Sequence, residues 1–157
     1  MAHPQLLLSN QLCFRFYALE RELMAAYRPL LDQLGLTYAQ YITLLYLWEH
    51  DKATVGELCI ALGLDTGTVS PLLKRLESAK LVERRRLPSD ERSVEVKVTK
   101  KGKALEEKAL SIPEHIASCL LIGDKEEQGN HFLQVRQMLD ETLEQLRTTR
   151  KQRVTVE

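Results

Sequence analysis

No apolar stretch in this sequence approaches the roughly 18 consecutive residues that a helix needs to cross a bilayer. Residues 1–10 also lack the charged start and the long apolar stretch of a secretory signal. We therefore expect a soluble, cytoplasmic protein without a membrane partner. Internal repeats and low-complexity stretches are absent as well, so the 157 residues, 44% of them apolar, are predicted to form one compact domain, residues 1–157.

Cysteine and histidine are too few and too scattered for a metal centre. The three cysteines, Cys13, Cys59 and Cys119, contain no Cys-x-x-Cys pair, and the four histidines are spread along the chain. This pattern excludes a disulfide framework and a zinc site. His115 and Cys119 are four residues apart, but no further ligand lies near them in the sequence, so we predict no metal and no other cofactor.

Neither sign of charge is in excess over the whole chain, because 22 basic side chains balance 22 acidic ones. Locally the charges separate. Residues 66–103 carry 11 basic and 5 acidic side chains, whereas the segments on either side each hold three more acidic than basic ones. A basic segment between acidic ones suits a module that meets phosphate groups with one surface, although a solvated charged surface has the same composition.

Apolar residues at helical spacing, with capping residues at the starts, predict four helices in the first half of the chain. Thr37 is a plausible N-cap for the second, Thr54 and Glu57 form a capping-box pattern for the third, and Asp65 caps the fourth. The predicted helices cover residues 6–34, 37–48, 54–62 and 66–79.

Only Gly63, Leu64 and Asp65 separate the third and fourth helices. Two short helices joined by so tight a turn form a helix-turn-helix, in which the second helix enters the major groove of DNA with its N-terminus first. An ordinary helical hairpin is the alternative. The outer side of the fourth helix carries hydroxyl and basic groups that we predict to bind DNA: Thr66, Thr68, Ser70, Lys74 and Arg75.

Two strand-like runs follow, residues 81–86 and 93–98, and a turn at 88–92 joins them into a β-hairpin with a basic tip. Such a hairpin beside a helix-turn-helix is a wing. Arg86 and Arg92 are predicted to reach phosphates or a narrow minor groove. Asp90 is predicted to hold Arg92 extended through a charge-assisted hydrogen bond.

The last third of the chain is predicted to be helical and to pair with a second copy. A helix follows Pro113 and carries Cys119, and a closing helix from Phe132 to Leu146 has an apolar stripe suited to pairing with its mate. Residues 151–157 lack an apolar face and are expected to fray. The predicted fold class is therefore mainly α with a small β-hairpin, a winged helix-turn-helix with dimerisation helices at both ends. Its parts are N-terminal dimerisation and sensing helices at 6–50, the winged helix-turn-helix at 51–100, and C-terminal dimerisation helices at 101–148.

Cys13 lies in the first turns of the long N-terminal helix. A cysteine reacts with peroxide as the thiolate, and hydrogen-bond donors must stabilise that form. Tyr27 is 14 residues further along nearly the same face, about 21 Å away at roughly 1.5 Å per residue, so it cannot touch Cys13 within one subunit. If this helix packs antiparallel across a two-fold axis, Tyr27 of a second copy can approach Cys13, and Tyr38 can join it. Taken alone, a cysteine on an apolar helical face is more often inert, which is what we predict for Cys59.

Several segments together resemble the MarR family of dimeric winged-helix regulators, and the resemblance covers most of the chain. In the DNA-binding half these segments are Asp65-Thr66-Gly67-Thr68-Val69-Ser70-Pro71-Leu72-Leu73-Lys74-Arg75-Leu76-Glu77, Asp90-Glu91-Arg92-Ser93 and Val98-Thr99-Lys100-Lys101-Gly102. Four others resemble the family's branch of organic hydroperoxide sensors, known as OhrR: Asn10-Gln11-Leu12-Cys13-Phe14, Tyr27-Arg28-Pro29-Leu30-Leu31, Leu36-Thr37-Tyr38 and Gln40-Tyr41. With this resemblance, Asp65 and Pro71 join the predicted DNA-binding residues.

The resemblance implies a homodimeric repressor of a pseudopalindromic operator in double-stranded DNA, with an organic hydroperoxide as inducer. The peroxide oxidises Cys13, the redox-sensing residue, and the repressor then leaves the operator. Tyr27 and Tyr38 match the tyrosines that bind the thiolate in this branch. Cys119 stands at about the position of the resolving cysteine in two-cysteine members, which implies an intersubunit disulfide between Cys13 and Cys119.

Three alternatives stay open. Cys119 is a buried helical cysteine instead of a resolving one, or the protein is a MarR-type repressor that a small phenolic ligand releases. The third is an enzyme, a thiol peroxidase, because an activated cysteine can reduce peroxide itself. The winged helix argues against the enzyme, so we predict a regulator without enzymatic activity.

Overall fold

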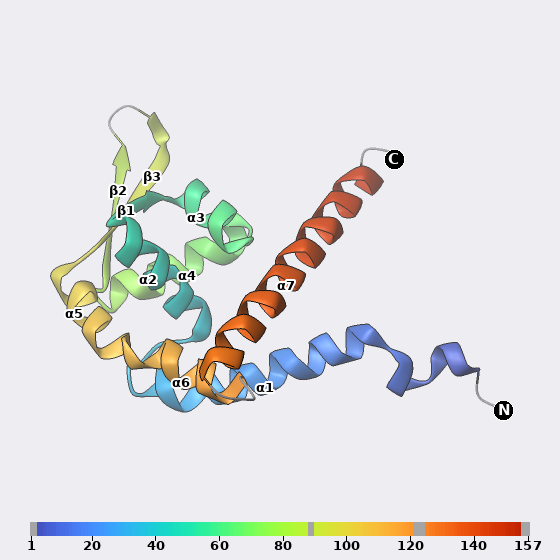
Figure 1. Cartoon of the computed structure of the whole chain (residues 1–157). Helices are drawn as coiled ribbons and strands as arrows, with labels where there is room; N and C mark the ends of the chain where they lie inside the picture. The colour runs from blue at the N-terminus through green and yellow to red at the C-terminus, as the bar shows by residue number, and fades with distance from the viewer. Residues whose placement is uncertain (1–2, 88–89, 121–124, 155–157) are drawn as a thin grey trace. The chain divides into compact units, whose positions relative to one another are not determined.

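The computed structural model describes residues 3–87, 90–120 and 125–154, without the side chains of residues 90–92, 125–128, 130 and 151–154 (Figure 1). The chain separates into two compact units, Met1–Ile116 and Ala117–Glu157, and each is described by itself. In chain order the elements are η1 (Pro4–Leu6), η2 (Leu8–Asn10), α1 (Leu12–Asp32), α2 (Tyr38–His50), β1 (Lys52–Thr54), α3 (Val55–Leu62), α4 (Thr66–Ser78), β2 (Val82–Leu87), β3 (Asp90–Val98), α5 (Lys100–Ala109), α6 (Ser111–Leu120) and α7 (Lys125–Val154).

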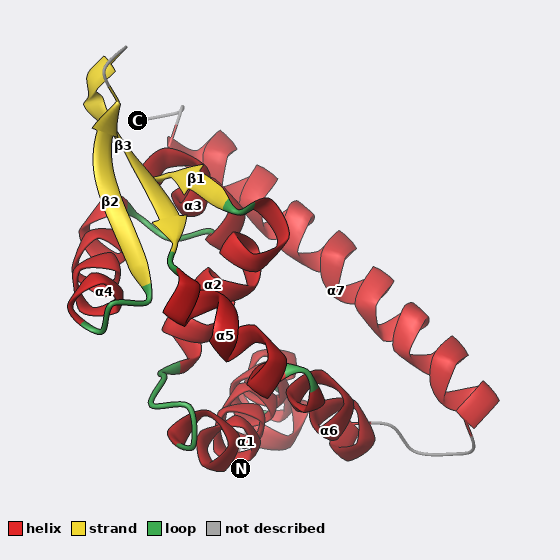
Figure 2. Ribbon diagram, turned by 90° about the vertical axis from the view of Figure 1, so that its left-hand side faces the viewer, coloured by secondary structure: helices red, strands yellow, loops and turns green. Residues whose placement is uncertain are grey.

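The predicted fold class, a mainly helical chain with a winged helix-turn-helix, is confirmed. Helices α3 and α4 form the helix-turn-helix, and three antiparallel strands in the order β1-β3-β2 form the wing sheet. Figure 2 shows α4 beside β2 and α5 beside α2, pairs of elements that are in contact. Helix α4 and the wing sheet are therefore neighbours.

Local capping sets the starts of α2, α3, α4 and α5. The predicted capping box is present: the Thr54 hydroxyl accepts a hydrogen bond from the Glu57 N–H at 3.2 Å, and the Glu57 carboxylate accepts one from the Thr54 N–H at 2.7 Å. A second box between Thr37 and Gln40 starts α2. Gly63 ends α3 with a φ of 65°, in the left-handed region that favours glycine.

Helix α1 begins at Leu12, later than the position predicted from apolar spacing. The side chains just before it bond to nearby backbone carbonyls. The Asn10 amide donates to the carbonyl of Pro4 at 2.9 Å, and the Gln11 amide donates to that of Gln5 at 2.7 Å. These side chains occupy backbone carbonyls that an α-helix would use as acceptors. The segment therefore forms two separate 3-10 turns, η1 and η2, instead of extending α1.

Strand β1 was not predicted from the sequence. It has only three residues, too few for an alternating pattern to stand out, and it exists because it pairs with β3, with Ala53 opposite Val96. Strands β2 and β3 confirm the predicted hairpin, whose register shifts between Arg86 and Leu87. Strand β3 begins at Asp90, so residues 90–92, which were predicted to belong to the turn, belong to the strand because Asp90 pairs with Leu87.

The core of the first unit lies between α2, α3, α4 and the inner face of the sheet. Its largest fully buried apolar side chains are Tyr41, Leu44, Leu47, Leu58, Val69, Leu73, Leu76, Val82 and Val96. Those of α4, Val69, Leu73 and Leu76, lie on one side of that helix, so its opposite side is left to face outward. Trp48 fastens α2 to α5, because its Nε1 donates to the Gly102 carbonyl at 2.9 Å.

Helices α1 and α7 keep many apolar side chains exposed. In α1 the exposed fraction is 68% for Leu12, 37% for Phe16 and 43% for Leu19. The exposed apolar side chains of α7 are Phe132, Leu133, Val135, Met138, Leu143 and Leu146. Each unit, taken by itself, thus has a helix with an uncovered apolar face among its described residues.

Candidate functional site

The outer side of α4 presents the residues that were predicted to bind DNA. Thr66, Thr68, Pro71, Lys74 and Arg75 are exposed, and Ser70 is half-buried. They share one side of the helix because the buried stripe occupies the other side. The structure thus brings these side chains together on one side of α4, whose C-terminal end is joined to β2 by Glu77 and Arg84.

Asp65, which was also predicted to bind DNA, is the N-cap of α4. Its Oδ1 accepts a hydrogen bond from the Thr68 N–H at 2.9 Å, and its Oδ2 accepts one from the Thr68 hydroxyl at 3.0 Å. These two bonds, with the hydroxyl bond as the larger cause, hold the pKa of the Asp65 carboxyl below its usual range. The carboxylate is therefore engaged with the start of its own helix.

The three consecutive arginines of β2 have different surroundings. Arg84 donates to Glu77 Oε2 from Nε at 2.9 Å and from Nη2 at 2.6 Å, an ion pair that joins β2 to α4 and lowers the pKa of the Glu77 carboxyl. Arg85 is exposed, with Nη2 3.6 Å from Glu83 Oε2. Arg86, a predicted DNA contact, is exposed too. Strand alternation puts Arg84 and Arg86 on the face of Val82, but it does not show that Glu77 reaches Arg84, so this pairing was missed.

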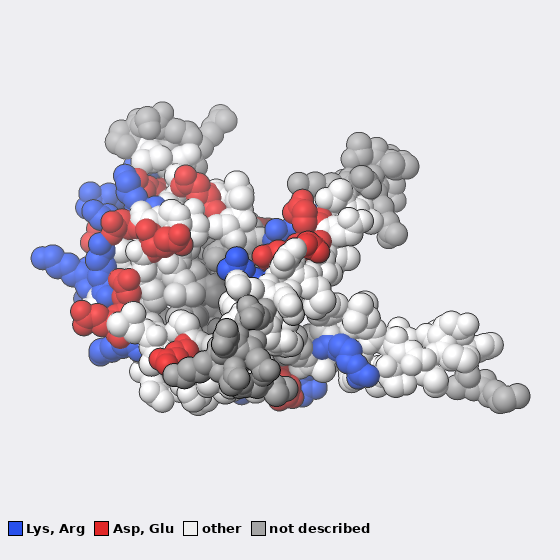
Figure 3. Space-filling model, viewed as in Figure 1, with Lys and Arg blue, Asp and Glu red and all other residues white. Residues whose placement is uncertain are grey.

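Ion pairs offset part of the positive charge of the winged helix-turn-helix. The Nζ of Lys52 lies 2.8 Å from Glu95 Oε2, and Lys103 pairs with Asp51. Figure 3 shows the same mixture, with Lys and Arg side chains gathered on the left of this face and Asp and Glu side chains among them. Among the described residues, the predicted basic DNA contacts that take part in no ion pair are Lys74, Arg75 and Arg86.

The wing tip carries the other two predicted DNA-binding residues. Asp90 and Arg92 belong to β3, but their side chains lie outside the described residues. The predicted hydrogen bond between them, and their contact with DNA, therefore stay predictions.

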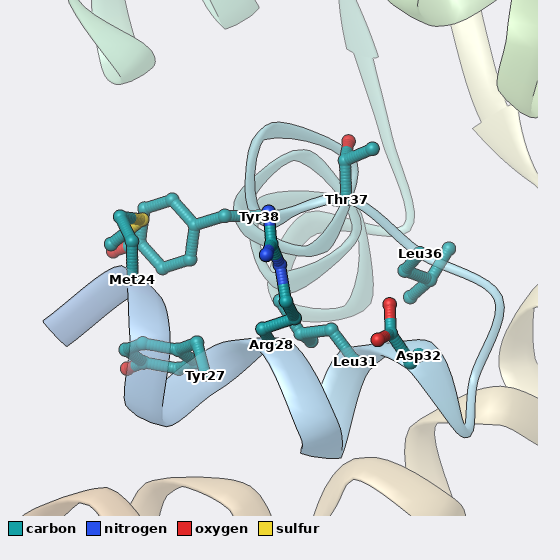
Figure 4. A pocket seen from close by; sticks show the side chains of 8 residues that line it. All are labelled: Met24, Tyr27, Arg28, Leu31, Asp32, Leu36, Thr37 and Tyr38. Carbon is teal, nitrogen blue, oxygen red and sulfur yellow. The ribbon is translucent and has the colours of Figure 1, made fainter. Parts of the chain in front are cut away.

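Tyr27 of α1 and Tyr38 of α2 lie together beside a pocket of about 320 Å³ (Figure 4). Their ring centroids are 4.9 Å apart in an edge-on arrangement. Tyr41 was not predicted for this site, yet its ring centroid is 6.0 Å from that of Tyr27. Its place three residues after Tyr38, on the same helical face, was the signal that could have pointed to it.

The phenols of this cluster stay protonated at neutral pH. Burial raises the pKa of Tyr27 to about 12, and the neighbouring Tyr38 and Tyr41 add to the effect. Burial is also the main cause that raises the pKa of Tyr38 and Tyr41. In Figure 4 the phenol oxygens of Tyr27 and Tyr38 lie on the same side of the pocket, at the end marked by Met24. The pair can therefore donate hydrogen bonds in one direction.

The three cysteines lie in different surroundings. Cys13 is exposed at the second residue of α1, and Tyr27 follows in the same helix, about 21 Å away within one chain at 14 residues of separation. Cys59 is half-buried against the core, with its Sγ 3.8 Å from the Thr66 hydroxyl oxygen, and its expected lack of reactivity stays a prediction. Cys119 is exposed near the end of α6, in the second unit.

In the part of the chain that the structure describes, no helix is both long and apolar enough to cross a membrane. No group of three or more His, Cys, Asp or Glu side chains among these residues is placed to hold a metal ion.

Comparisons with known proteins place the chain in a family. The family model described as "Transcriptional regulator SarA/Rot" matches residues 25–109, more than half of the chain. The organic hydroperoxide resistance transcriptional regulator of Bacillus subtilis is 45% identical over 139 residues, which cover 88% of this chain and 91% of that protein. The crystal structure of MarR matches with a TM-score of 0.70 at 25% identity, over 83% of this chain and 95% of MarR. The chain belongs to the MarR/SarA family of transcriptional regulators. This MarR-family chain is accordingly a regulator and not an enzyme.

AbfR of Staphylococcus epidermidis is a relative with several solved structures. This MarR-family chain is 34% identical to AbfR in the structure of reduced AbfR bound to DNA, with a TM-score of 0.75 over 93% of this chain and 99% of AbfR. It is 36% identical to disulfide-formed AbfR, with a TM-score of 0.63 over 87% of this chain and 92% of that one. AbfR itself has therefore been seen both reduced on DNA and with a disulfide.

Proposed function

We propose that this MarR-family chain is a homodimeric repressor that binds a pseudopalindromic DNA operator and leaves it when an organic hydroperoxide oxidises Cys13. The observation that carries the proposal is an exposed Cys13 on the uncovered apolar face of α1, together with a pair of protonated tyrosines further along the same chain. The name of the Bacillus subtilis relative and the reduced, DNA-bound structure of AbfR support the same function.

The uncovered apolar faces support the dimer. Leu12, Phe16 and Leu19 follow one another along the exposed side of α1, and α7 has a similar stripe. Exposed apolar surfaces of this extent mark protein–protein contacts. A second copy of the chain would cover both, and we keep the division into dimerisation helices at 6–50 and 101–148 around the DNA-binding part at 51–100 as part of this proposal.

A dimer also completes the thiol site. Tyr27 and Tyr38 cannot reach Cys13 of their own chain, but antiparallel packing of two α1 helices brings the tyrosine pair of one subunit to the Cys13 of the other. Phenol O–H groups that keep their protons are suitable donors to a thiolate. Two such donors favour the thiolate, the form that reacts with peroxide.

The proposed reaction begins when the Cys13 thiolate attacks the terminal oxygen of the hydroperoxide. The O–O bond breaks, the sulfur is oxidised to a sulfenic acid, and an alcohol leaves after taking up a proton. The thiol of Cys119 in the other subunit then displaces water from the sulfenic acid and forms an intersubunit disulfide. The sulfenic acid no longer accepts the tyrosine hydrogen bonds as a thiolate does, and the disulfide displaces α1. The distance between the DNA-binding parts of the two subunits, residues 51–100 of each, therefore changes.

The DNA-bound form follows from the exposed surface of the first unit. Two α4 helices enter successive major grooves of the operator, with Thr66, Thr68, Ser70 and Pro71 toward the bases. Lys74, Arg75 and Arg86, which no described ion pair engages, meet phosphates or the adjoining minor groove together with Arg92. Two rigid DNA-binding parts fit the operator only at one separation, so oxidation lowers the affinity of the dimer for the operator and ends repression.

The test compares Cys13→Ser with Cys59→Ser as a matched control. Both variants should bind DNA selected from a random pool, as measured by fluorescence anisotropy. Treatment with cumene hydroperoxide should release the wild type and Cys59→Ser, while Cys13→Ser stays bound. Release of Cys13→Ser by the peroxide would overturn the sensor assignment.

A second comparison isolates the resolving step. Wild type treated with peroxide should run as a crosslinked dimer on a non-reducing denaturing gel, and a thiol reductant should return it to the monomer. Cys119→Ser should form the Cys13 sulfenic acid without crosslinking. A wild type that never crosslinks would remove the resolving role from Cys119.

A second candidate function has an observation in its favour. A pocket of about 290 Å³ between α2 and the α5–α6 region is lined by aromatic and apolar side chains, among them Tyr41, Leu45, Trp48 and Pro113. Such a lining suits the ring of a small phenolic ligand. Under this alternative Cys13→Ser would still respond to the natural inducer, and a phenol would quench the fluorescence of Trp48, the sole tryptophan.

A further inference from the structure

The first two turns of α4 present less hydrogen-bonding capacity to DNA than their sequence suggests. Thr68 is exposed, yet its hydroxyl donates to Asp65 Oδ2 at 3.0 Å while its N–H donates to Oδ1 of the same carboxylate at 2.9 Å. An ionised carboxylate is an acceptor only, so the hydroxyl must give it its single proton. That proton is not available to an acceptor on a base.

The same bond orients the rest of the side chain. Threonine is branched at Cβ, so once Oγ1 is held by Asp65 the direction of the methyl group is fixed as well. Gly67 helps to keep the carboxylate in place, because a Cβ at that position would come within 2.9 Å of Asp65 Oδ1. The donor capacity of the hydroxyl is therefore used in the helix cap; its oxygen can still accept a hydrogen bond, and the methyl is the apolar part of Thr68 that is left for a partner.

Pro71 extends this apolar feature. It stands three residues after Thr68, which places both on the same face of α4, and it is exposed. Its ring has no N–H to offer. The basic side chains of Lys74 and Arg75 begin only in the following turn. A methyl group and a pyrrolidine ring thus form a small apolar patch at the end of the helix that enters the groove.

We propose that Thr68 and Pro71 recognise the C5 methyl group of a thymine in each half of the operator. In the major groove this methyl is the apolar group that base pairs display, and side-chain methyl groups contact it. Thr68 is then a specificity-determining residue that reads thymine by apolar contact instead of by its hydroxyl. The inference rests on the proposed DNA-binding function and adds the chemistry of the base that is read.

The test removes single methyl groups from the DNA. The protein selects an operator from a random pool, and each thymine is replaced in turn by deoxyuridine, which lacks only the C5 methyl. At one thymine in each half-site the replacement should weaken binding of the reduced wild type about fourfold, as expected for one methyl group returned to water. Replacement in both half-sites should weaken it about fifteenfold.

Two variants of Thr68 separate the methyl from the hydroxyl. Thr68→Ser keeps the hydroxyl and removes the methyl, so the penalty for deoxyuridine should shrink to the part that Pro71 contributes. Thr68→Val keeps a methyl group and removes the hydroxyl, so the penalty for deoxyuridine should persist. The proposal is overturned if no single replacement weakens wild-type binding, or if Thr68→Val loses the thymine dependence and Thr68→Ser keeps it in full. Failure to select any DNA would overturn the proposed function itself, whereas selected DNA without a methyl effect overturns this inference alone.

Discussion

Gly102→Ala should destabilise the protein far more than an alanine normally does in a helix. Gly102 lies in the first turn of α5, and a Cβ there would overlap the carbonyl oxygen of Leu81 and come within 2.7 Å of Val98 Cγ2. Carbon atoms pack favourably at about 3.5–4.0 Å, so α5 would have to move away from the sheet. That movement would stretch the hydrogen bonds from Trp48 to the Gly102 carbonyl, 2.9 Å, and from the Thr99 N–H to the Leu81 carbonyl, 3.0 Å.

The magnitude follows from these contacts. Overpacking costs about 1–3 kcal/mol, and each weakened internal hydrogen bond costs about 1 kcal/mol. The better helix propensity of alanine offsets about 1 kcal/mol of this. We expect a net loss of about 3 kcal/mol in the free energy of unfolding. Trp48 fluorescence should shift, because its indole N–H loses a partner.

Urea unfolding at a fixed protein concentration measures this loss, because the stability of a dimer depends on concentration. Gly56→Ala is the matched control, since a Cβ at Gly56 would meet only the Thr54 hydroxyl at an ordinary 3.9 Å. It should leave stability unchanged or raise it by up to about 1 kcal/mol. If Gly102→Ala were as stable as the wild type, with unchanged Trp48 fluorescence, the close approach of α5 to Leu81 would be refuted.

Three further predictions concern other positions. Lys80 has a φ of 62°, so Lys80→Gly should stabilise the protein by about 1 kcal/mol in urea unfolding, whereas Lys108→Gly in α5 should destabilise it. Arg84→Met should lower the free energy of unfolding by about 1 kcal/mol at neutral pH. Because the ion pair lowers the pKa of Glu77, this loss should fade as the pH falls below the usual glutamate range. Equal losses at neutral and at acidic pH would contradict the ion pair. The pKa of Tyr27 is raised to about 12 in the folded chain, whereas in the unfolded chain the phenol ionises near its usual pKa of about 10. The free energy of unfolding should therefore fall as the pH rises from about 10 to about 12, and Tyr27→Phe should reduce this fall.

Local features of the sequence determined α2, α3 and α4 and their starts. The capping box of Thr54 and Glu57, the cap at Asp65 and the buried stripe of α4 were all predictable, because each depends on residues within one or two helical turns of one another. The helix-turn-helix and the hairpin follow from the same short-range rules. The outward direction of the reading side of α4 also follows, since it is the complement of the buried stripe.

Tertiary structure decided which groups are left to act. Strand alternation separates Arg84 from Arg85, but only the folded chain brings Glu77 within 2.6 Å of Arg84. Tyr41 joins Tyr27 because two helices cross, and β1 exists because β3 pairs with it. Hydrogen bonds and ion pairs act over about 3 Å, whereas sequence patterns report periodicity along one element, so contacts between elements depend on the packing of the whole unit.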